Sequence, residues 1–471
     1  MSTNTRNKRE NTDSVPLDPY FSPVGDKLID IGKWEGKMHK VFHKELKRKG
    51  IPYFGISKLE DTLNHLKNMG VRRILIIAAD ETIHPFRVAI RYRDKVSILK
   101  VESKFGLVKE LVFNIQLPRF TCGGGDCWSS YVPEDLGSAK EDVLKIHFIP
   151  INAEIKGMET REVVRKVYEK RRDFEGALFH ARLMSKALKR VKSIGNEYDL
   201  VLVLIDGPLL PPHLDPHVGQ GTRLMLDVWR LLGEDNMRAL LDMKEMMLST
   251  YLSIFDQVLQ SENIVLVGAV KRSRDQTLQY RLFGHIEEGR YDTDILISYL
   301  KGGEGIGPYF IDRLFMFAKE LRRFNIEKVT NEEVKYRVPI HSYIVRRFEY
   351  ALPIRLDVIM PDVLREVEGS IVNFLANFII TSDKHTYIAS KEEGILLKVP
   401  TLFPIYLVDK ELDKLGKLVE NMYRLEIKRV WNSIKDWVVE KYWDKNEEVE
   451  VGYFNELREE LKDKIEWGDV P

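Results

Sequence analysis

Two acidic residues that each follow an uninterrupted apolar run are the first feature of this chain that could do chemistry. Asp206 follows Leu200–Ile205 and precedes Gly207-Pro208, and Asp80 follows Ile74–Ala79. A continuous apolar run bounded by turn residues is typical of a strand buried on both faces. An acid at the tip of such a strand is costly unless a partner, commonly a cation, neutralises it. Asp206 alone is more often an ordinary turn residue.

A third carboxylate, Glu175, lies between them on a helix predicted over Glu159–Lys192. Judged locally, Glu175 is a solvated partner of Arg171 or Arg172. If the two acid-tipped strands lie side by side and the helix crosses the sheet, however, all three carboxylates can reach one point. Clustered carboxylates hold Mg²⁺ or Mn²⁺, and a pair of such ions hydrolyses phosphodiesters by activating water and stabilising the developing charge.

Basic residues follow a further apolar run, Ile264–Val270, where Lys271 and Arg274 stand at another predicted strand end. We expect these two residues, together with Arg171 and Arg172, to contact a phosphate backbone. The alternative is that they form a solvated loop cluster.

The order of these elements predicts how the acids are positioned. A strand with Asp80 is followed by a hairpin around Arg93-Asp94-Lys95, then by the helix with Glu175, and then by the strand with Asp206. This order predicts an α/β fold, a ribonuclease H-like mixed sheet flanked by helices, with an insertion and a long helical C-terminal extension.

Composition narrows the function classes. The chain has 471 residues, 31% of them charged, and a formal net charge of +1, so any nucleic-acid surface must be local. No stretch approaches the roughly 20 apolar residues of a membrane helix, and the polar N-terminus lacks a signal core, so we expect a cytoplasmic protein without membrane contact. The two cysteines, Cys122 and Cys127, have no second pair to complete a zinc site and are interpreted as thiols.

Several blocks, in order along the chain, resemble the NurA nucleases of archaea and some bacteria. They read IIAADETIHP, Arg171-Arg172-Asp173-Phe174-Glu175 as an R-x-x-x-E helix block, LVLIDGPLLPP, VGAVKRSRD, DTDILISYLKGGEGIGP, YIVRRFEYALPIRLDVIMP and FPIYLVDK. They cover roughly Ile74 to Lys410. By this resemblance the chain divides into a disordered N-terminus over 1–25, a NurA-like nuclease domain over 26–410 with an insertion at about 104–155, and a helical extension over 411–471.

The resemblance implies a metal-dependent DNA nuclease that uses Mn²⁺ or Mg²⁺. It implies 5′-to-3′ exonuclease and single-strand endonuclease action on single strands and duplex ends. A homodimer working with a HerA-type hexameric ATPase in the resection of double-strand breaks is also implied. Matched by residue, Asp80, Glu175 and Asp206 fall on the metal carboxylates, and Lys271 falls on the basic strand-end position. Asp409 is the candidate auxiliary acid of the closing block.

Two alternatives stay open. Glu81 stands where the family carries glycine after its first aspartate, which leaves room for a nuclease-fold scaffold of the ATPase that has lost catalysis. The other alternative is a different ribonuclease H-like nuclease that acts on RNA or on junctions.

Overall fold

The computed structural model describes the backbone of residues 42–92, 95–121, 129–132, 144–148, 158–210, 234–271, 278, 282, 291–309, 313–316, 335–338, 340–390, 395–414 and 449–453. The predicted disordered N-terminus, Cys122, Cys127 and Arg274 lie outside these ranges. Within the described ranges, no helix is long and apolar enough to cross a membrane.

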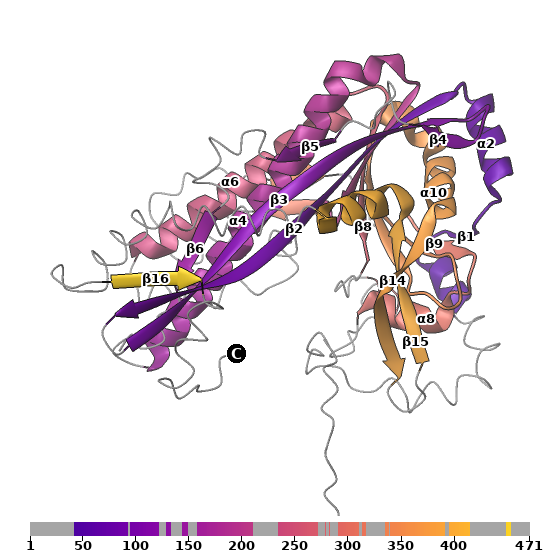
Figure 1. Cartoon of the computed structure of the whole chain (residues 1–471). Coiled ribbons are helices and arrows are strands. Elements are labelled where there is room, and N and C mark those ends of the chain that lie inside the picture. The colour runs from indigo at the N-terminus through magenta and orange to yellow at the C-terminus, as the bar shows by residue number, and fades with distance from the viewer. Residues whose placement is uncertain are drawn as a thin grey trace, which may run out of the picture.

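A mixed sheet of twelve strands forms the centre of the protein (Figure 1). Its main path is β1-β9-β12-β13-β8-β7-β2-β3-β4, with β16 paired to β2, and with β5 and β6 paired to β3. Strand β7 is parallel to both β2 and β8, whereas β8 and β13 are antiparallel. The strands of this sheet are β1 Tyr53–Gly55, β2 Arg73–Tyr92, β3 Lys95–Asn114, β4 Arg119–Thr121, β5 Ser129–Val132, β6 Leu144–Phe148, β7 Leu200–Asp206, β8 Ile264–Val270, β9 Glu304–Ile306, β12 His341–Arg346, β13 Ile354–Ile359 and β16 Val449–Tyr453.

Two separate ribbons complete the described strands. Strands β10 (Arg313–Met316) and β11 (Lys335–Val338) pair with each other, and so do β14 (Ile379–Ser390) and β15 (Ile395–Leu402). The predicted α/β fold with a mixed sheet flanked by helices is therefore confirmed.

Helices cover both faces of the central sheet. One face, called here the α4 face, is covered by α4 (Met158–Ile194) and α6 (Glu234–Leu259). The other, called the α10 face, is covered by α2 (Leu59–Asn68), α10 (Glu368–Asn377) and a helix over residues 403–414. Helix α8 (Asp292–Tyr299) packs in a smaller core beside β9 and β12. The predicted long helix is confirmed as α4.

The three apolar runs predicted as buried strands lie in β2, β7 and β8. Every side chain of Leu200–Ile205 is buried. Val201, Val203 and Ile205 face the α4 core, while Leu200, Leu202 and Leu204 face the α10 core, because successive strand residues point to opposite faces. A strand with helices on both sides needs apolar residues at every position, which explains the uninterrupted run.

Strands β2 and β3 form a long hairpin that projects from the body of the protein, with α4 and α6 along one side of it (Figure 1). The predicted hairpin is thereby confirmed, since Tyr92 pairs with Lys95. Two expectations are corrected. Asp80 does not end a strand, because β2 continues through the alternating residues after it to Tyr92. The proposed insertion at 104–155 begins inside β3, because residues 104–114 pair with β2 in unbroken register.

The C-terminal extension, expected to be helical over 411–471, contains a strand. Val449–Tyr453 forms β16 and pairs antiparallel with the projecting part of β2, with Val451 opposite Ile90. The sequence VEVGY has the two-residue alternation of a strand, and β2 offers it an edge beyond the end of β7. The extension therefore returns to the sheet.

Candidate functional site

Asp80 and Asp206 lie side by side at the edge where the parallel strands stop being paired. The β2–β7 register matches Ala79 with Ile205, so the next residue on each strand is the aspartate. Asp80 continues the row of Ile74, Ile76 and Ala78, and Asp206 continues the row of Leu202 and Leu204. The side chains of both rows lie on the α10 face of the sheet. The predicted neighbouring position of these two acids is confirmed.

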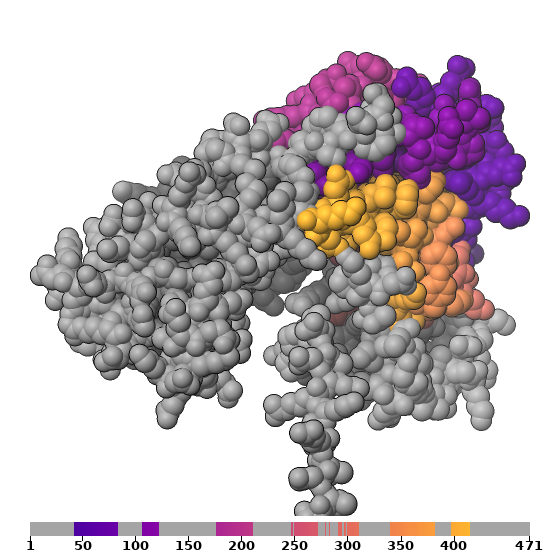
Figure 2. Space-filling view, viewed as in Figure 1, coloured from indigo at the N-terminus to yellow at the C-terminus, as the bar shows by residue number. Residues whose placement is uncertain are grey.

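The helix over residues 403–414 brings Asp409 to the same point. Its Val408 and Leu412 pack on Ala78 and Leu107, directly beside Asp80. The ammonium of Lys109 on β3 forms an ion pair with Glu411, two residues after Asp409 on the same helix. Figure 2 shows the yellow-orange segment that includes this helix at the surface of the molecule, next to the orange segment that precedes it in the chain. Apolar contacts and one ion pair thus hold Asp409 over the strand edge.

Lys271 supplies the cation of this cluster. It follows β8, where Asp206 pairs with Ala269, so two residues later the lysine side chain returns to the α10 face. Its Nζ lies 2.9 Å from Oδ2 of Asp206 and donates a hydrogen bond to it. Burial alone would lower the pKa of Lys271, but the negative charges of Asp206, Asp80 and Asp409 outweigh burial and raise it. Lys271 therefore stays charged among three carboxylates.

The electrostatics of the cluster centre on Asp80, which is only 5% exposed. Burial raises the pKa of Asp80 well above its usual range, and the charges of Asp206 and Asp409 raise it further. The Lys271 ammonium and the Glu81 amide oppose this shift. That amide donates a 2.7 Å hydrogen bond to Oδ1 of Asp80. The site thus holds more negative charge than its own lysine neutralises.

The donor set fits a hard divalent cation in kind. Asp80, Asp206 and Asp409 offer carboxylate oxygens, the ligands that Mg²⁺ and Mn²⁺ prefer. Oδ1 of Asp206 is buried and accepts no hydrogen bond within the described part of the chain. As positioned, though, no group of three or more His, Cys, Asp or Glu among the described residues is arranged to enclose a metal ion. A cation would have to draw the carboxylates together and displace the lysine.

The turn after Asp206 leads the chain to the α4 face. The residues that follow β7 therefore do not cover the carboxylate cluster on the α10 face. Gly207 has a φ of 105°, a conformation that favours glycine, and it leads the chain towards the α4 face. There Leu209 and Leu210 enter the core. A side chain on Gly268 would lie 2.7 Å from the Gly207 carbonyl oxygen and 2.8 Å from the Leu209 nitrogen. The close approach of this turn to β8 explains both glycines.

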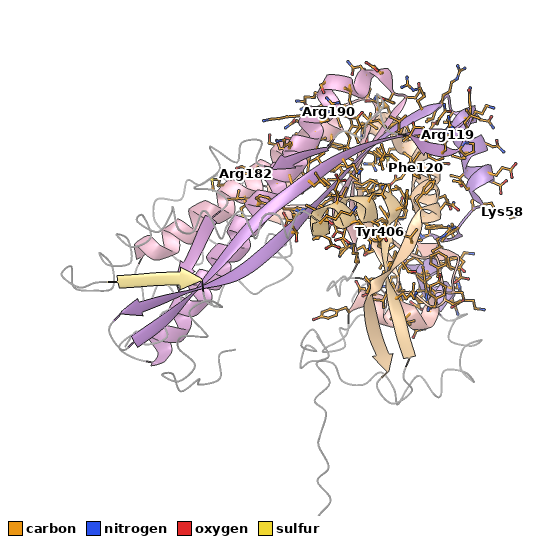
Figure 3. All side chains as sticks on the ribbon, viewed as in Figure 1. Lys58, Arg119, Phe120, Arg182, Arg190 and Tyr406 are labelled. Carbon is orange, nitrogen blue, oxygen red and sulfur yellow. The ribbon has the colours of Figure 1, made fainter. Side chains whose placement is uncertain are left out.

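Glu81 points away from the aspartates. As the next residue on β2 it faces α4, where its Oε2 lies 3.8 Å from Nδ1 of His180. Figure 3 shows Arg182 and Arg190 of α4 on one side of the β2–β3 ribbon and Tyr406 of helix 403–414 on the other. His180 is a residue that sequence reasoning missed, because a single histidine on a long helix carries no motif. Glu81 does not enter the carboxylate cluster.

Several predicted site residues are placed only by their backbone. Glu175, Arg171 and Arg172 lie on α4, but the structure describes only the backbone of these three residues. The described part of α4 packs on the α4 face through residues such as Ala181 and Leu183. Of the predicted acids, the structure brings together Asp80, Asp206 and Asp409, with Lys271.

Comparisons with known proteins were made by sequence and by structure. The sequence matches no protein-family model and no curated protein. Among solved structures, the NurA nuclease from Sulfolobus solfataricus is 14% identical, with 84% of this chain and 95% of that chain covered and a TM-score of 0.33.

Two further solved structures have similar values. A structure described as NurA is 14% identical and covers 69% of this chain and 89% of its own, with a TM-score of 0.28. A structure of NurA with manganese is 12% identical, with 73% of this chain and 90% of that chain covered and a TM-score of 0.26.

Proposed function

We propose that this protein is a divalent-metal-dependent nuclease that hydrolyses DNA phosphodiester bonds. The observation that carries the proposal is the meeting of Asp80, Asp206 and Asp409 with Lys271 at one edge of the parallel strands. The cluster combines excess negative charge, an acceptor oxygen of Asp206 without a hydrogen-bond partner among the described residues, and one ammonium. A cation at the carboxylates and a phosphate at the lysine would satisfy all three features.

Asp80, Asp206 and Asp409 would hold the cation, and Glu175 is the further carboxylate that we propose from the sequence. When bound, Mn²⁺ or Mg²⁺ supplies an activated water and stabilises charge on the attacked phosphate. The protein itself contributes orientation. The Glu81 amide fixes one oxygen of Asp80, and Lys271, once a cation replaces it at Asp206, can reach a phosphate oxygen. We propose phosphate contacts for Arg274, Arg171 and Arg172 as well.

The arrangement of elements supports a ribonuclease H-like core. An antiparallel hairpin (β2 and β3) is followed by the covering helix α4, then by β7 parallel to β2, and then by β8 parallel to β7. This is the layout in which acids from two neighbouring strands and a helix share one site. The finer proposals rest on the sequence blocks. They are 5′-to-3′ exonuclease and single-strand endonuclease action, a homodimer, and a HerA-type hexameric ATPase as partner.

Cleavage of 5′-labelled and 3′-labelled single-stranded and duplex DNA, with and without Mn²⁺, tests the proposal. Mutation of residues that only orient metal ligands commonly costs about 10–100-fold, so D206N, which changes a direct ligand, should lose at least about 100-fold in rate. The matched control is D256N, which changes an exposed aspartate on α6 and should cleave like the wild type. Full activity of D206N would overturn the site. Absence of cleavage in the wild type, with the ATPase still bound, would favour the scaffold alternative.

A further inference from the structure

A stacked pair of aromatic rings lies on the connection between β12 and β13, residues 347–353. The rings of Phe348 and Tyr350 are nearly parallel, at 16°, with their centroids 5.2 Å apart. Tyr350 is 52% exposed, and Phe348 is partly buried against the α10 core. The Arg347 guanidinium lies 5.4 Å from the centre of the Phe348 ring. The outer ring of this pair is therefore available to a ligand.

Hydrogen bonds from two sides hold the connection between β12 and β13 in place. The buried guanidinium of Arg346 donates to the carbonyl oxygens of Ala351, Glu349, Ile297 and Leu300, at distances from 2.5 to 3.2 Å. On the other side, the Lys398 amide of β15 donates to the Tyr350 carbonyl, and the Leu352 amide donates to that of Lys398.

Arg347 is fixed as well. Its Nη1 donates to the Ala376 carbonyl and to Oδ1 of Asn377, both at 3.1 Å. A charged group that is already ordered loses little freedom when a ligand binds beside it. The three residues Arg347, Phe348 and Tyr350, called here the aromatic ledge, therefore form a rigid platform.

The aromatic ledge lies at the same edge of the sheet as the carboxylate cluster. Asp206 pairs with Ala269 on β8, and the next residue, Val270, pairs with Arg355 near the start of β13. The β12–β13 turn projects from this edge. Neighbouring strands are about 4.8 Å apart, so the ends of β7 and β13 are separated by roughly 10 Å. Phe348 and Tyr350 precede Ile354, the first residue of β13, by six and four residues, so an extended strand of several nucleotides would join the ledge to the cluster.

We propose that the aromatic ledge stacks an unpaired base of single-stranded DNA and so positions the strand over the carboxylate cluster. The proposal deepens the nuclease function and rests on it for the choice of ligand. A flat, exposed and rigid aromatic ring beside an ordered guanidinium is the chemistry that binds bases without regard to their sequence. Lys271 directly follows β8, the strand between β7 and β13, and would contact the phosphate backbone of a strand that runs from the ledge to Asp206.

Binding is measured in EDTA, where no cleavage occurs, with the full chain and a short single-stranded oligonucleotide containing 2-aminopurine. Stacking of this base quenches its fluorescence. Y350A should remove the quenching and weaken binding about 5- to 150-fold, the range expected for the loss of one stacked base. Y350F should keep both properties, because it keeps the ring. The same oligonucleotide as a blunt duplex should bind without dependence on Tyr350.

The control is L117A, which truncates an exposed side chain (59%) on the turn between β3 and β4, at the opposite edge of the sheet. It should bind and quench like the wild type. Unchanged binding and quenching in Y350A would overturn the ledge, and so would loss of both in Y350F. If the wild type binds with quenching but never cleaves DNA with Mn²⁺, base stacking on the aromatic ledge is supported and the nuclease function is overturned. If the wild type cleaves DNA and Y350A binds and quenches like the wild type, the nuclease function is supported and base stacking on the aromatic ledge is overturned.

Discussion

The Lys271 ammonium lies 2.9 Å from a carboxylate oxygen of Asp206. Asp206 ends β7, and Lys271 directly follows β8, the neighbouring parallel strand that ends at the same edge of the sheet. Because Asp80 and Asp409 also act on this lysine, it is the built-in counter-ion of a site with three acids. The lysine therefore occupies a position that a divalent cation would compete for, and this competition has measurable consequences.

Replacing Lys271 by methionine should destabilise the protein in EDTA. The carboxylates would lose their counter-ion while keeping their mutual repulsion. Since both partners are about a quarter exposed, we expect a loss of about 1–2 kcal/mol in the free energy of unfolding. Mn²⁺ should restore more stability to K271M than to the wild type. Denaturant unfolding with and without Mn²⁺ measures both effects. The control K189M changes an exposed lysine of α4, and a K271M variant that behaves like it would contradict the counter-ion role.

Replacing Asp80 by asparagine should stabilise the protein in EDTA at pH 7. The raised pKa means that folding disfavours the charged carboxylate, so Asp80 costs stability above its folded-state pKa and none below its ordinary value of 3.8. Asparagine keeps an oxygen that can accept the hydrogen bond from the Glu81 amide. We expect a gain in the free energy of unfolding at pH 7 that shrinks as the pH falls towards 3.8. Thermal unfolding of D80N and wild type across pH 4–8 measures it, and a gain independent of pH would refute the electrostatic cause.

Mn²⁺ should raise the melting temperature of the wild-type protein. A ligand that binds only the folded state stabilises it by about 2.7 kcal/mol at a hundred times its dissociation constant. D206N should lose most of this gain, because it removes an acceptor oxygen that has no hydrogen-bond partner among the described residues. Calorimetry at increasing Mn²⁺ concentration checks the prediction, with D256N as the control that keeps the full shift. An equal shift in D206N would place the metal elsewhere.

Replacing Gly268 by alanine should disturb the strand edge. The added methyl group would meet backbone atoms of Gly207 and Leu209 at 2.7 and 2.8 Å, and backbone cannot rotate away as a side chain can. We expect a loss of about 1–3 kcal/mol in unfolding free energy, together with lower activity, because the turn directly follows Asp206. G369A, at a glycine whose added methyl group would meet no atom within 4 Å, is the matched control. A G268A variant as stable as G369A would show that the turn moves freely.

The sequence by itself determined the elements whose signal is local. Uninterrupted apolar runs identified β7 to within one residue and β8 to the residue, and the helix predicted over Glu159–Lys192 is α4. It also placed Asp80 and Asp206 on neighbouring strands, because the order of elements allows few arrangements. The strands and the helix depend on residues within one element, so the pattern of that element is enough to predict them, whereas the neighbouring position of the two strands depends on the order of elements.

Only the tertiary structure decided which acids share a face. Asp80 and Glu81 are adjacent in sequence, yet they point to opposite faces of the sheet, and the packing of Val408 and Leu412 brings Asp409 to Asp80. The full length of β2 and the strand at Val449–Tyr453 were likewise decided by pairing with distant strands. The spacing of apolar residues in the sequence indicates which side chains are buried, but it does not indicate which residues they pack against. The partner of each charge therefore emerges only when segments far apart in the chain come together.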